Sequence, residues 1–291
     1  MVAIKIPIEV ERLRKWRFLG YYLSIYTTII SNNFPRFYYI DALAGSGKYN
    51  MENIGEVEGS PLLSLKIKFP FTHYIFIENK EDIFRELKDN VEEFKTKQGS
   101  LRTRCKQQGE IIETNVDVQC CYGNVKDLLK EKLSEIPNNV PCFVFLDPYG
   151  IEEIPWNSTV KVCLERDKTE LLINFSLMGI TRCIGARKTW RTLNNFFGED
   201  RWKDFINSAN PLKELTKLYM NKLSKDKKWV VKTPPIKNET GFPVYCLIFA
   251  TNNDTAHRIW KEDVIRRVPE IWQEKDLMKW IKSRYKPLSE F

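Results

Sequence analysis

Apolar residues recur along this chain in two alternating patterns. Short unbroken apolar runs alternate with longer stretches in which apolar residues return every three or four positions. The first pattern is typical of strands that are buried on both faces of a sheet, and the second of amphipathic helices. The alternation therefore predicts a parallel sheet that is covered by helices on both sides.

Five apolar runs are predicted to be strands: 37–40, 73–77, 116–122, 142–146 and 170–175. Helices are predicted over 9–30, from 60 to about 69, and over 81–97, 125–133 and 158–165. The second helix has the clearest start, because Ser60 is a good N-cap and Pro61 suits the first helical position. The chain thus reads as five successive strand–helix units.

The last third of the chain departs from this repeat. Residues 181–224 are predicted to be mostly helical, and 228–232 and 244–250 to be two further strands. The connection between these strands is too short for a crossover helix, which favours an antiparallel hairpin. Charged helices that carry Trp260, Trp272 and Trp280 are expected to follow. The predicted fold is a doubly wound α/β fold with a mostly parallel seven-stranded sheet and a C-terminal antiparallel hairpin.

No internal repeat and no long linker interrupts the sequence, which favours a single domain over residues 1–291. Within it we expect four parts: an N-terminal helical extension (1–36), a cofactor-binding core (37–176), a basic helical insertion (177–227) and the terminal hairpin and helices (228–291).

Composition narrows the class of protein. An apolar content of 43% excludes a disordered chain. No apolar run is long enough to span a membrane and no signal-peptide core is present, so a cytoplasmic protein without membrane contact is expected. The net charge of +8, from 46 Lys and Arg against 38 Asp and Glu, suits a polyanionic partner but does not identify one.

The cysteines and histidines do not indicate a metal centre. The seven cysteines are odd in number and form no C-x-x-C motif, and only two histidines are present. Neither a disulfide framework nor a metal site is therefore expected. Cys142, Cys163 and Cys246 lie in apolar stretches, which predicts buried free thiols.

In doubly wound sheets, ligands bind beyond the carboxyl ends of the strands. The first strand is followed by D-A-L-A-G-S-G, residues 41–47, in which Gly45 and Gly47 allow positive φ and a close approach of backbone N–H groups to a ligand. A dinucleotide fingerprint would need glycine at Asn50. An ordinary tight turn is the alternative interpretation.

A phosphate-binding P-loop is a second incomplete match. It would use Gly47 and Lys48, but it requires glycine at Ala42 and serine or threonine at Tyr49. A nucleotide-dependent phosphotransferase is therefore kept only as a minor alternative.

Two other strand ends carry candidate chemistry. Glu78 closes the second strand, where an acid can accept both ribose hydroxyls of a nucleoside, although a solvated strand end would look the same. Asp147-Pro148-Tyr149 follows the fourth strand. The Asp147 carboxylate and the Pro148 carbonyl can accept the two hydrogens of an amine, while the Tyr149 ring can stack on a base. A simple Asp-Pro turn is the alternative.

Taken together, these strand ends resemble class I S-adenosylmethionine-dependent methyltransferases. The resemblance implies that the loop from Asp41 through Ala44, Gly45 and Gly47 holds the methionine part of S-adenosylmethionine and that Glu78 holds its ribose. It also places Asn124, after the third strand, near the cofactor's adenine, although a turn residue fits Gly-Asn equally well. The Asp147 motif then positions the methyl acceptor, with Asn174 and Ser176 lining its pocket.

A closer resemblance is to the three-Cys-motif partner family, TcmP. It rests on Tyr39–Gly47, Gly59–Leu62, Phe145–Gly150, Leu172–Phe175 and Leu247–Asn252, and it extends from about 37 to 251. The family name refers to three cysteines in a partner protein, so the resemblance implies a protein partner encoded nearby.

The fourth-strand motif reads Asp147-Pro148-Tyr149-Gly150 and lacks the second proline that is typical of adenine N6 methyltransferases. It is similar to the Asp-Pro-Phe-Gly of tRNA guanine N2 dimethyltransferases. The accepted amine, and whether it belongs to DNA or RNA, therefore stays open.

The segment after the fifth strand mixes cations with aromatic residues. Arg182, Arg187, Lys188 and Arg191 are predicted to contact nucleic-acid phosphates, and the aromatic residues among and after them either stack on bases or face the core. The expected activity is methyl transfer from S-adenosylmethionine to an amino group of a nucleic-acid base. A non-catalytic partner subunit with the same fold is the main alternative.

Overall fold

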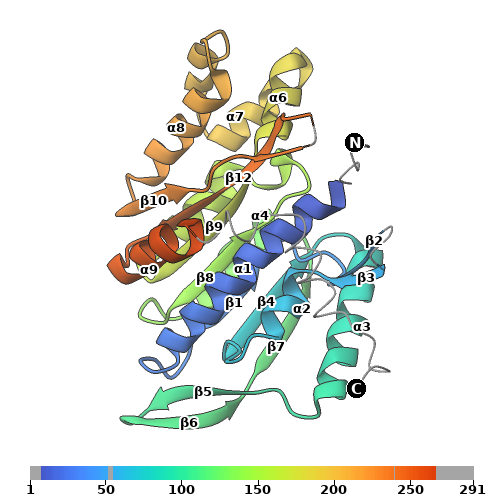
Figure 1. The fold of residues 1–291 in the computed structure, drawn as a ribbon, viewed down its shortest axis with the longest axis vertical. Coiled ribbons are helices and arrows are strands. Elements are labelled where there is room, and N and C mark those ends of the chain that lie inside the picture. The colour runs from blue at the N-terminus through green and yellow to red at the C-terminus, as the bar shows by residue number, and fades with distance from the viewer. Residues whose placement is uncertain (1–7, 52–54, 239, 267–291) are drawn as a thin grey trace, which may run out of the picture.

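A mostly parallel sheet forms the centre of the computed structural model, which describes residues 8–51, 55–238 and 240–266 (Figure 1). The strand order is β10-β12-β9-β8-β1-β4-β7. The parallel strands are β1 (Tyr38–Asp41), β4 (His73–Glu78), β7 (Asp117–Tyr122), β8 (Cys142–Leu146) and β9 (Thr169–Ser176). All five predicted strands are thereby confirmed.

The predicted C-terminal hairpin is also present. Strand β12 (Pro243–Thr251) runs antiparallel to both β9 and β10 (Trp229–Lys232). A short additional strand, β11 (Ile236–Lys237), pairs with β12 and brings the sheet to eight strands among the described residues.

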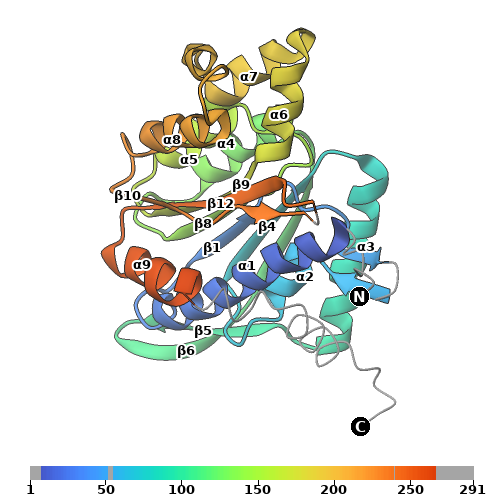
Figure 2. The same ribbon diagram turned by 45° about the horizontal axis from the view of Figure 1, so that its top comes forward.

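Helices cover both faces of the sheet (Figure 2). One face carries α1 (Ile8–Ile30), α2 (Ser60–Leu65), α3 (Glu81–Gln98) and α9 (Asp254–Ile259). The other carries α4 (Val125–Glu135), α5 (Lys161–Leu164), α7 (Trp190–Phe197) and α8 (Pro211–Leu223), with α6 (Leu177–Gly185) following β9. No helix among these described residues is long and apolar enough to cross a membrane. Of the three late tryptophans, Trp272 and Trp280 lie outside the described residues.

The start of α2 corrects one expectation. Its N-cap is Gly59, so Ser60 is already helical, and the helix ends at Leu65 rather than near residue 69. The Ser60 side chain hydrogen-bonds the Asp41 carboxylate instead of capping its own helix. Ser60, whose sequence position suggests a helix N-cap, therefore contacts Asp41 at the end of β1 instead.

Strand β8 explains why the apolar runs are unbroken. Cys142, Val144 and Leu146 face the α4 side of the sheet, whereas Phe143 and Phe145 face the α1 side, and all five are fully buried. Both faces of the strand are therefore excluded from water. The predicted burial of Cys142, Cys163 and Cys246 as free thiols is confirmed.

Two antiparallel hairpins interrupt the strand–helix repeat and were not predicted. One consists of β2 (Lys48–Met51) and β3 (Gly55–Glu58), and it lies between the glycine loop and α2. The other consists of β5 (Arg102–Gln107) and β6 (Glu110–Asn115), beside the end of α1 (Figure 1).

Candidate functional site

Three predicted site segments meet at the carboxyl ends of neighbouring strands. Asp41 ends β1, Glu78 ends β4 and Asp147 follows β8. Because β1 pairs with both β4 and β8, these three ends are adjacent. The negative charge of Asp147 is close enough to raise the pKa of Asp41.

The glycine loop has the backbone that its sequence predicted. Gly45 has φ +66° and Gly47 has φ +79°, a region that favours glycine. The Ala44 N–H donates to the Ile77 carbonyl at 2.9 Å, which ties the loop to β4. The chain then enters strand β2, whereas a P-loop leads into a helix. The phosphotransferase alternative therefore lacks its structural context.

Glu78 anchors this loop through its carboxylate. Oε2 accepts a hydrogen bond from the Gly45 N–H at 3.0 Å, and Oε1 accepts from the N–H groups of Asn79 and Lys80 at 2.9 Å each. The side chain is buried, so these contacts are shielded from bulk water. The predicted ribose-binding acid and the predicted cofactor loop are thus in direct contact.

Asp41 is a buried carboxylate with an incomplete set of partners. It is fully buried. Oδ2 accepts from the Tyr39 hydroxyl at 3.2 Å, while Oδ1 has no hydrogen-bond partner among the described groups. Burial raises the pKa of the Asp41 carboxyl from 3.8 to about 7, and hydrogen bonds from Ser60 and Tyr39 oppose that rise. A buried acceptor without a donor fits a site for a cationic ligand group.

Asp41→Asn is expected to stabilise the protein in mildly alkaline solution. The folded-state pKa of Asp41, about 7, lies above its ordinary value of 3.8. The contribution of Asp41 to the free energy of unfolding is therefore largest below pH 3.8 and falls as the pH rises from 3.8 toward about 7. Since each pH unit between them is worth about 1.4 kcal/mol, the loss reaches roughly 4 kcal/mol, which a neutral amide avoids. Urea unfolding at about pH 5 and about pH 8 measures the difference.

Glu170→Gln is the matched control for that variant. Glu170 is also buried, burial raises its pKa to about 7, and it accepts from the Tyr22 hydroxyl at 2.5 Å near the start of β9. We expect both variants to gain stability at about pH 8, but only Asp41→Asn to weaken binding of S-adenosylhomocysteine. Equal binding by the two variants would contradict a ligand role for Asp41.

Asp147 has partners that the sequence did not indicate. Lys15 of α1 contacts both carboxylate oxygens, with Nζ 2.6 Å from Oδ1 and 2.5 Å from Oδ2. The Asn174 side-chain amide also donates to Oδ1 at 2.8 Å. Lys15 is therefore a site residue that sequence reasoning missed, because it lies in a helix that carries many other charges and gives no local sign of its partner.

Tyr149 projects from the same motif into solvent. Its side chain is 86% exposed, and the Lys80 ammonium lies 5.6 Å from its ring centroid. The backbone N–H groups of Tyr149 and Gly150 both donate to the Glu153 carboxylate, at 2.6 and 3.3 Å. The loop is thus fixed while the ring stays open, an arrangement that suits stacking on a flat ligand.

Asn124 lies at the neighbouring strand end. Its side-chain oxygen caps α4 by accepting from the Lys126 N–H at 2.9 Å, and the preceding Gly123 N–H donates to the Glu78 carbonyl at 3.0 Å. The helix cap accounts for an asparagine at this position. Its predicted contact with adenine stays a prediction.

In the basic segment after β9, the cationic side chains are exposed and most of the aromatic ones are buried. Arg182, Arg187, Lys188 and Arg191 are exposed, and none forms an ion pair with a residue that the structure describes. Most of the aromatic side chains face inward: Phe196, Phe197 and Trp202 are buried. The cations are thus available to a partner, whereas these three aromatic rings belong to the core.

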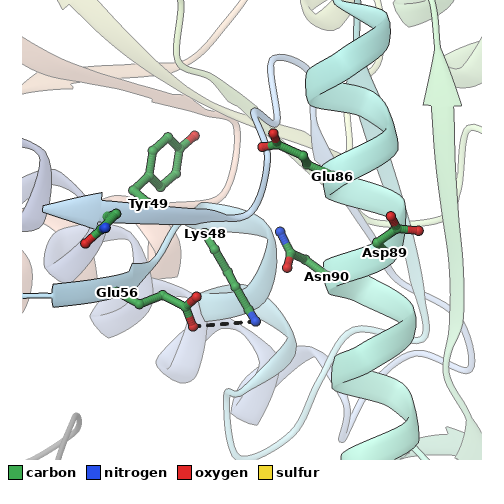
Figure 3. Close-up of a pocket in the computed structure, with 7 residues that line it drawn as sticks. Lys48, Tyr49, Glu56, Glu86, Asp89 and Asn90 are labelled. Carbon is green, nitrogen blue, oxygen red and sulfur yellow. Dashed lines mark ion pairs between the residues drawn. The ribbon is translucent and has the colours of Figure 1, made fainter.

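A hollow of about 320 Å³ lies between the β2–β3 hairpin and α3 (Figure 3). None of the residues predicted for the methyltransferase site lines it, but Lys48 of the phosphotransferase alternative does. Lys48 and Tyr49 point to opposite sides of β2, and Lys48 pairs with Glu56 at 3.5 Å and with Glu93 at 2.6 Å. Asn90 links α3 to the glycine loop by donating to the Ser46 carbonyl at 2.9 Å. The Lys48 ammonium is therefore held by two carboxylates on the side of β2 opposite to Tyr49.

Comparison with known proteins supports the fold. No family model matches the sequence, and no curated protein matches it. Among solved structures, protein LPL1258 from Legionella pneumophila is similar with a TM-score of 0.52 and 10% identity, over 92% of this chain and 93% of that one.

Two further structures have lower TM-scores. The O-methyltransferase from Bacillus cereus in complex with SAH has a TM-score of 0.42 and 12% identity, over 86% of this chain and 94% of that one. Trm1 from Pyrococcus horikoshii with S-adenosyl-L-methionine has a TM-score of 0.41 and 11% identity, over 87% of this chain and 60% of that one. At these identities the likeness concerns the fold alone. The chain has an α/β, Rossmann-like fold with a mostly parallel central sheet.

Proposed function

We propose that this protein is an S-adenosylmethionine-dependent methyltransferase that acts on an amino group of a nucleic-acid base. The observation that carries the proposal is the meeting of Asp147-Pro148-Tyr149 with Asp41, Gly45 and Glu78 at one edge of the sheet. An acceptor motif with an exposed ring thus adjoins a loop built for close backbone contact. Membership of the TcmP family, with a protein partner, is part of this proposal.

The site residues suit the cofactor. The unpartnered Oδ1 of Asp41 is a fitting acceptor for the ammonium group of the methionine part, and the Glu78 carboxylate for ribose hydroxyls. S-adenosylmethionine would supply an electrophilic methyl group on a sulfonium. Asn124 and Ala44 complete the proposed cofactor surface from neighbouring positions.

The acceptor side works by alignment. The Asp147 carboxylate and the Pro148 carbonyl accept the hydrogens of the amine, which fixes the direction of its lone pair, and Tyr149 stacks on the base. Transfer of the methyl group would break its bond to the sulfonium, leaving the neutral thioether S-adenosylhomocysteine, and would form the carbon–nitrogen bond. The Asp147 carboxylate would stabilise the positive charge that develops on the nitrogen. The extra proton then leaves to water.

A non-catalytic partner subunit is the second candidate, and the Lys15–Asp147 pair favours it. An ammonium group that contacts both oxygens of the carboxylate neutralises the charge that catalysis would use. A chain that had lost catalysis would retain such a pair without cost.

Calorimetry separates these functions from nucleotide-dependent phosphotransfer. We expect the protein to bind S-adenosylmethionine and S-adenosylhomocysteine but not ATP. Transfer of a labelled methyl group to total RNA or DNA then identifies an enzyme, while cofactor binding without transfer to either pool identifies the partner subunit. Binding of ATP alone would overturn the methyltransferase proposal.

The exposed cations after β9 are proposed to hold the nucleic acid. Replacing Arg182, Arg187 and Arg191 together with glutamine is expected to weaken binding to single-stranded RNA or DNA about tenfold or more at moderate salt, because phosphate contacts are lost. Each lost contact is also expected to make the affinity less dependent on salt. A filter-binding titration at several salt concentrations measures both effects. Lys126, Lys130 and Lys213 changed to glutamine give a control with the same loss of charge, and equal weakening would indicate nonspecific attraction.

A further inference from the structure

Two consecutive residues of α1 contact the two halves of the candidate site. Lys15 forms its ion pair with Asp147 of the acceptor motif. Trp16 packs on Tyr49, which follows the glycine loop, with 5.2 Å between the ring centroids. Both α1 side chains are buried. One helical segment therefore joins the proposed cofactor loop to the proposed acceptor motif.

Tyr49 is closely fitted to the glycine loop. A Cβ atom at Gly45 would lie 2.0 Å from the Tyr49 hydroxyl oxygen, and one at Gly59 would lie 2.5 Å from Cε2 of its ring. Gly59 has φ −81°, which any residue adopts, so space for the Tyr49 ring is what requires glycine there. A ligand that approaches Gly45 from this side must move Tyr49.

The groups that ligands would contact are enclosed. Asp41, Glu78 and Asn174 are buried, and the Asp147 side chain is only 14% exposed. The Asn174 Oδ1 atom, like Asp41 Oδ1, is buried and has no hydrogen-bond partner within the described part of the chain. The later part of α1 is fixed in the core through Leu19, Tyr22 and Leu23. Lys15 and Trp16 therefore contact this enclosed site from the part of α1 that precedes these core residues.

We propose that Lys15 and Trp16 are positioning residues that couple the cofactor loop to Asp147. A ligand at Gly45 displaces the Tyr49 ring, and Trp16 moves with the ring that it packs on. Because Lys15 is the neighbouring residue of the same helix, it then withdraws from the Asp147 carboxylate. The Asp147 oxygens then become available to the acceptor amine. This inference rests on the proposed function and makes cofactor binding precede acceptor binding.

The proposed coupling predicts that breaking the Lys15–Asp147 pair increases ligand affinity, which a purely structural role of the pair would not produce. If the Lys15–Asp147 pair stabilises the arrangement that opposes ligand entry, breaking the pair increases the fraction of protein that is competent to bind. Loss of an ordinary structural contact would instead weaken binding or leave it unchanged. The pair is broken from one side by Lys15→Met and from the other by Asp147→Asn.

The test is calorimetry of the full chain with S-adenosylhomocysteine. Lys15→Met, Asp147→Asn and Trp16→Leu are each expected to bind it at least about fivefold more tightly than the wild type, the lower end of common coupling energies. Because the first two variants break the same contact, combining them is expected to add little. Lys228→Met, which breaks the Lys228–Asp254 pair at 2.7 Å between the residue before β10 and the start of α9, is the matched control and is expected to leave affinity within about twofold.

The outcomes separate the two proposals. If the wild type binds S-adenosylhomocysteine but the folded Lys15→Met and Asp147→Asn variants bind it equally or more weakly, the coupling is overturned and the proposed function stands. If the wild type binds neither S-adenosylhomocysteine nor S-adenosylmethionine, the proposed function fails and the coupling fails with it. Circular dichroism establishes folding of each variant, and Asp147→Asn supplies the result should Lys15→Met fail to fold.

Discussion

Asp147→Ala is expected to lower the rate of methyl transfer about a hundredfold to a thousandfold. The substitution removes the carboxylate that aligns the amine and stabilises its developing charge, and losing one such electrostatic contact typically has this effect. It also leaves the Lys15 ammonium without its carboxylate partner. Single-turnover transfer of a labelled methyl group to nucleic acid measures the loss.

The loss is expected in the chemical step alone. Binding of S-adenosylhomocysteine by Asp147→Ala should be no weaker than in the wild type, because the glycine loop and Glu78 are untouched. Asp254→Ala provides the control, since Asp254 is also ion-paired, with Lys228, but lies at the start of α9. Wild-type transfer by Asp147→Ala would remove this residue from the proposed mechanism.

Glu78→Ala is expected to weaken binding of S-adenosylhomocysteine about a hundredfold or more. The carboxylate would accept the ribose hydroxyls, and it also accepts from the Gly45 N–H, so its removal loses ligand contacts and loosens the loop. Hydrogen bonds to a charged group contribute about 1.5–3 kcal/mol each, and losing two gives an effect of this size. Calorimetry measures the affinity directly.

Glu93→Ala is the matched control for Glu78→Ala. Glu93 is a carboxylate on the surface of α3 that pairs with Lys48 at 2.6 Å and with Lys97 at 2.5 Å, and its pKa is lowered to about 2 by these hydrogen bonds. Its removal is expected to leave cofactor affinity unchanged. Unchanged affinity in Glu78→Ala as well would mean that the ribose is bound elsewhere.

The strands of the core and the helices that cover them follow from features that are local in sequence. Unbroken apolar runs such as 142–146 require burial on two faces, and the helical periodicity between them supplies the covering layers. The positive φ of Gly45 and Gly47 is likewise a property of those residues. Such features are visible in one sequence because each depends on its own few neighbours.

The two inserted hairpins had no comparable signal. In β2–β3, Met51 and Val57 are buried, while the remaining residues are polar or partly exposed. In β5–β6, Thr103 and Cys105 are buried. The Thr103 hydroxyl donates to the distant Pro70 carbonyl, and the Lys106 N–H donates to the Phe34 carbonyl. Short ribbons of this kind are stabilised by segments far away in the chain, so their sequences carry little strand periodicity.

The layered sheet and the side chains at its strand ends can be predicted from the sequence, because strand and helix periods and glycine conformations are set by nearby residues. The contacts that those side chains make are visible only in the folded structure. Lys15 and Asp147 lie 132 residues apart in the chain, and Ser60, a helix cap by its local pattern, serves Asp41 instead. Contacts between distant segments depend on how helices pack on the sheet, and no single stretch of sequence contains that information.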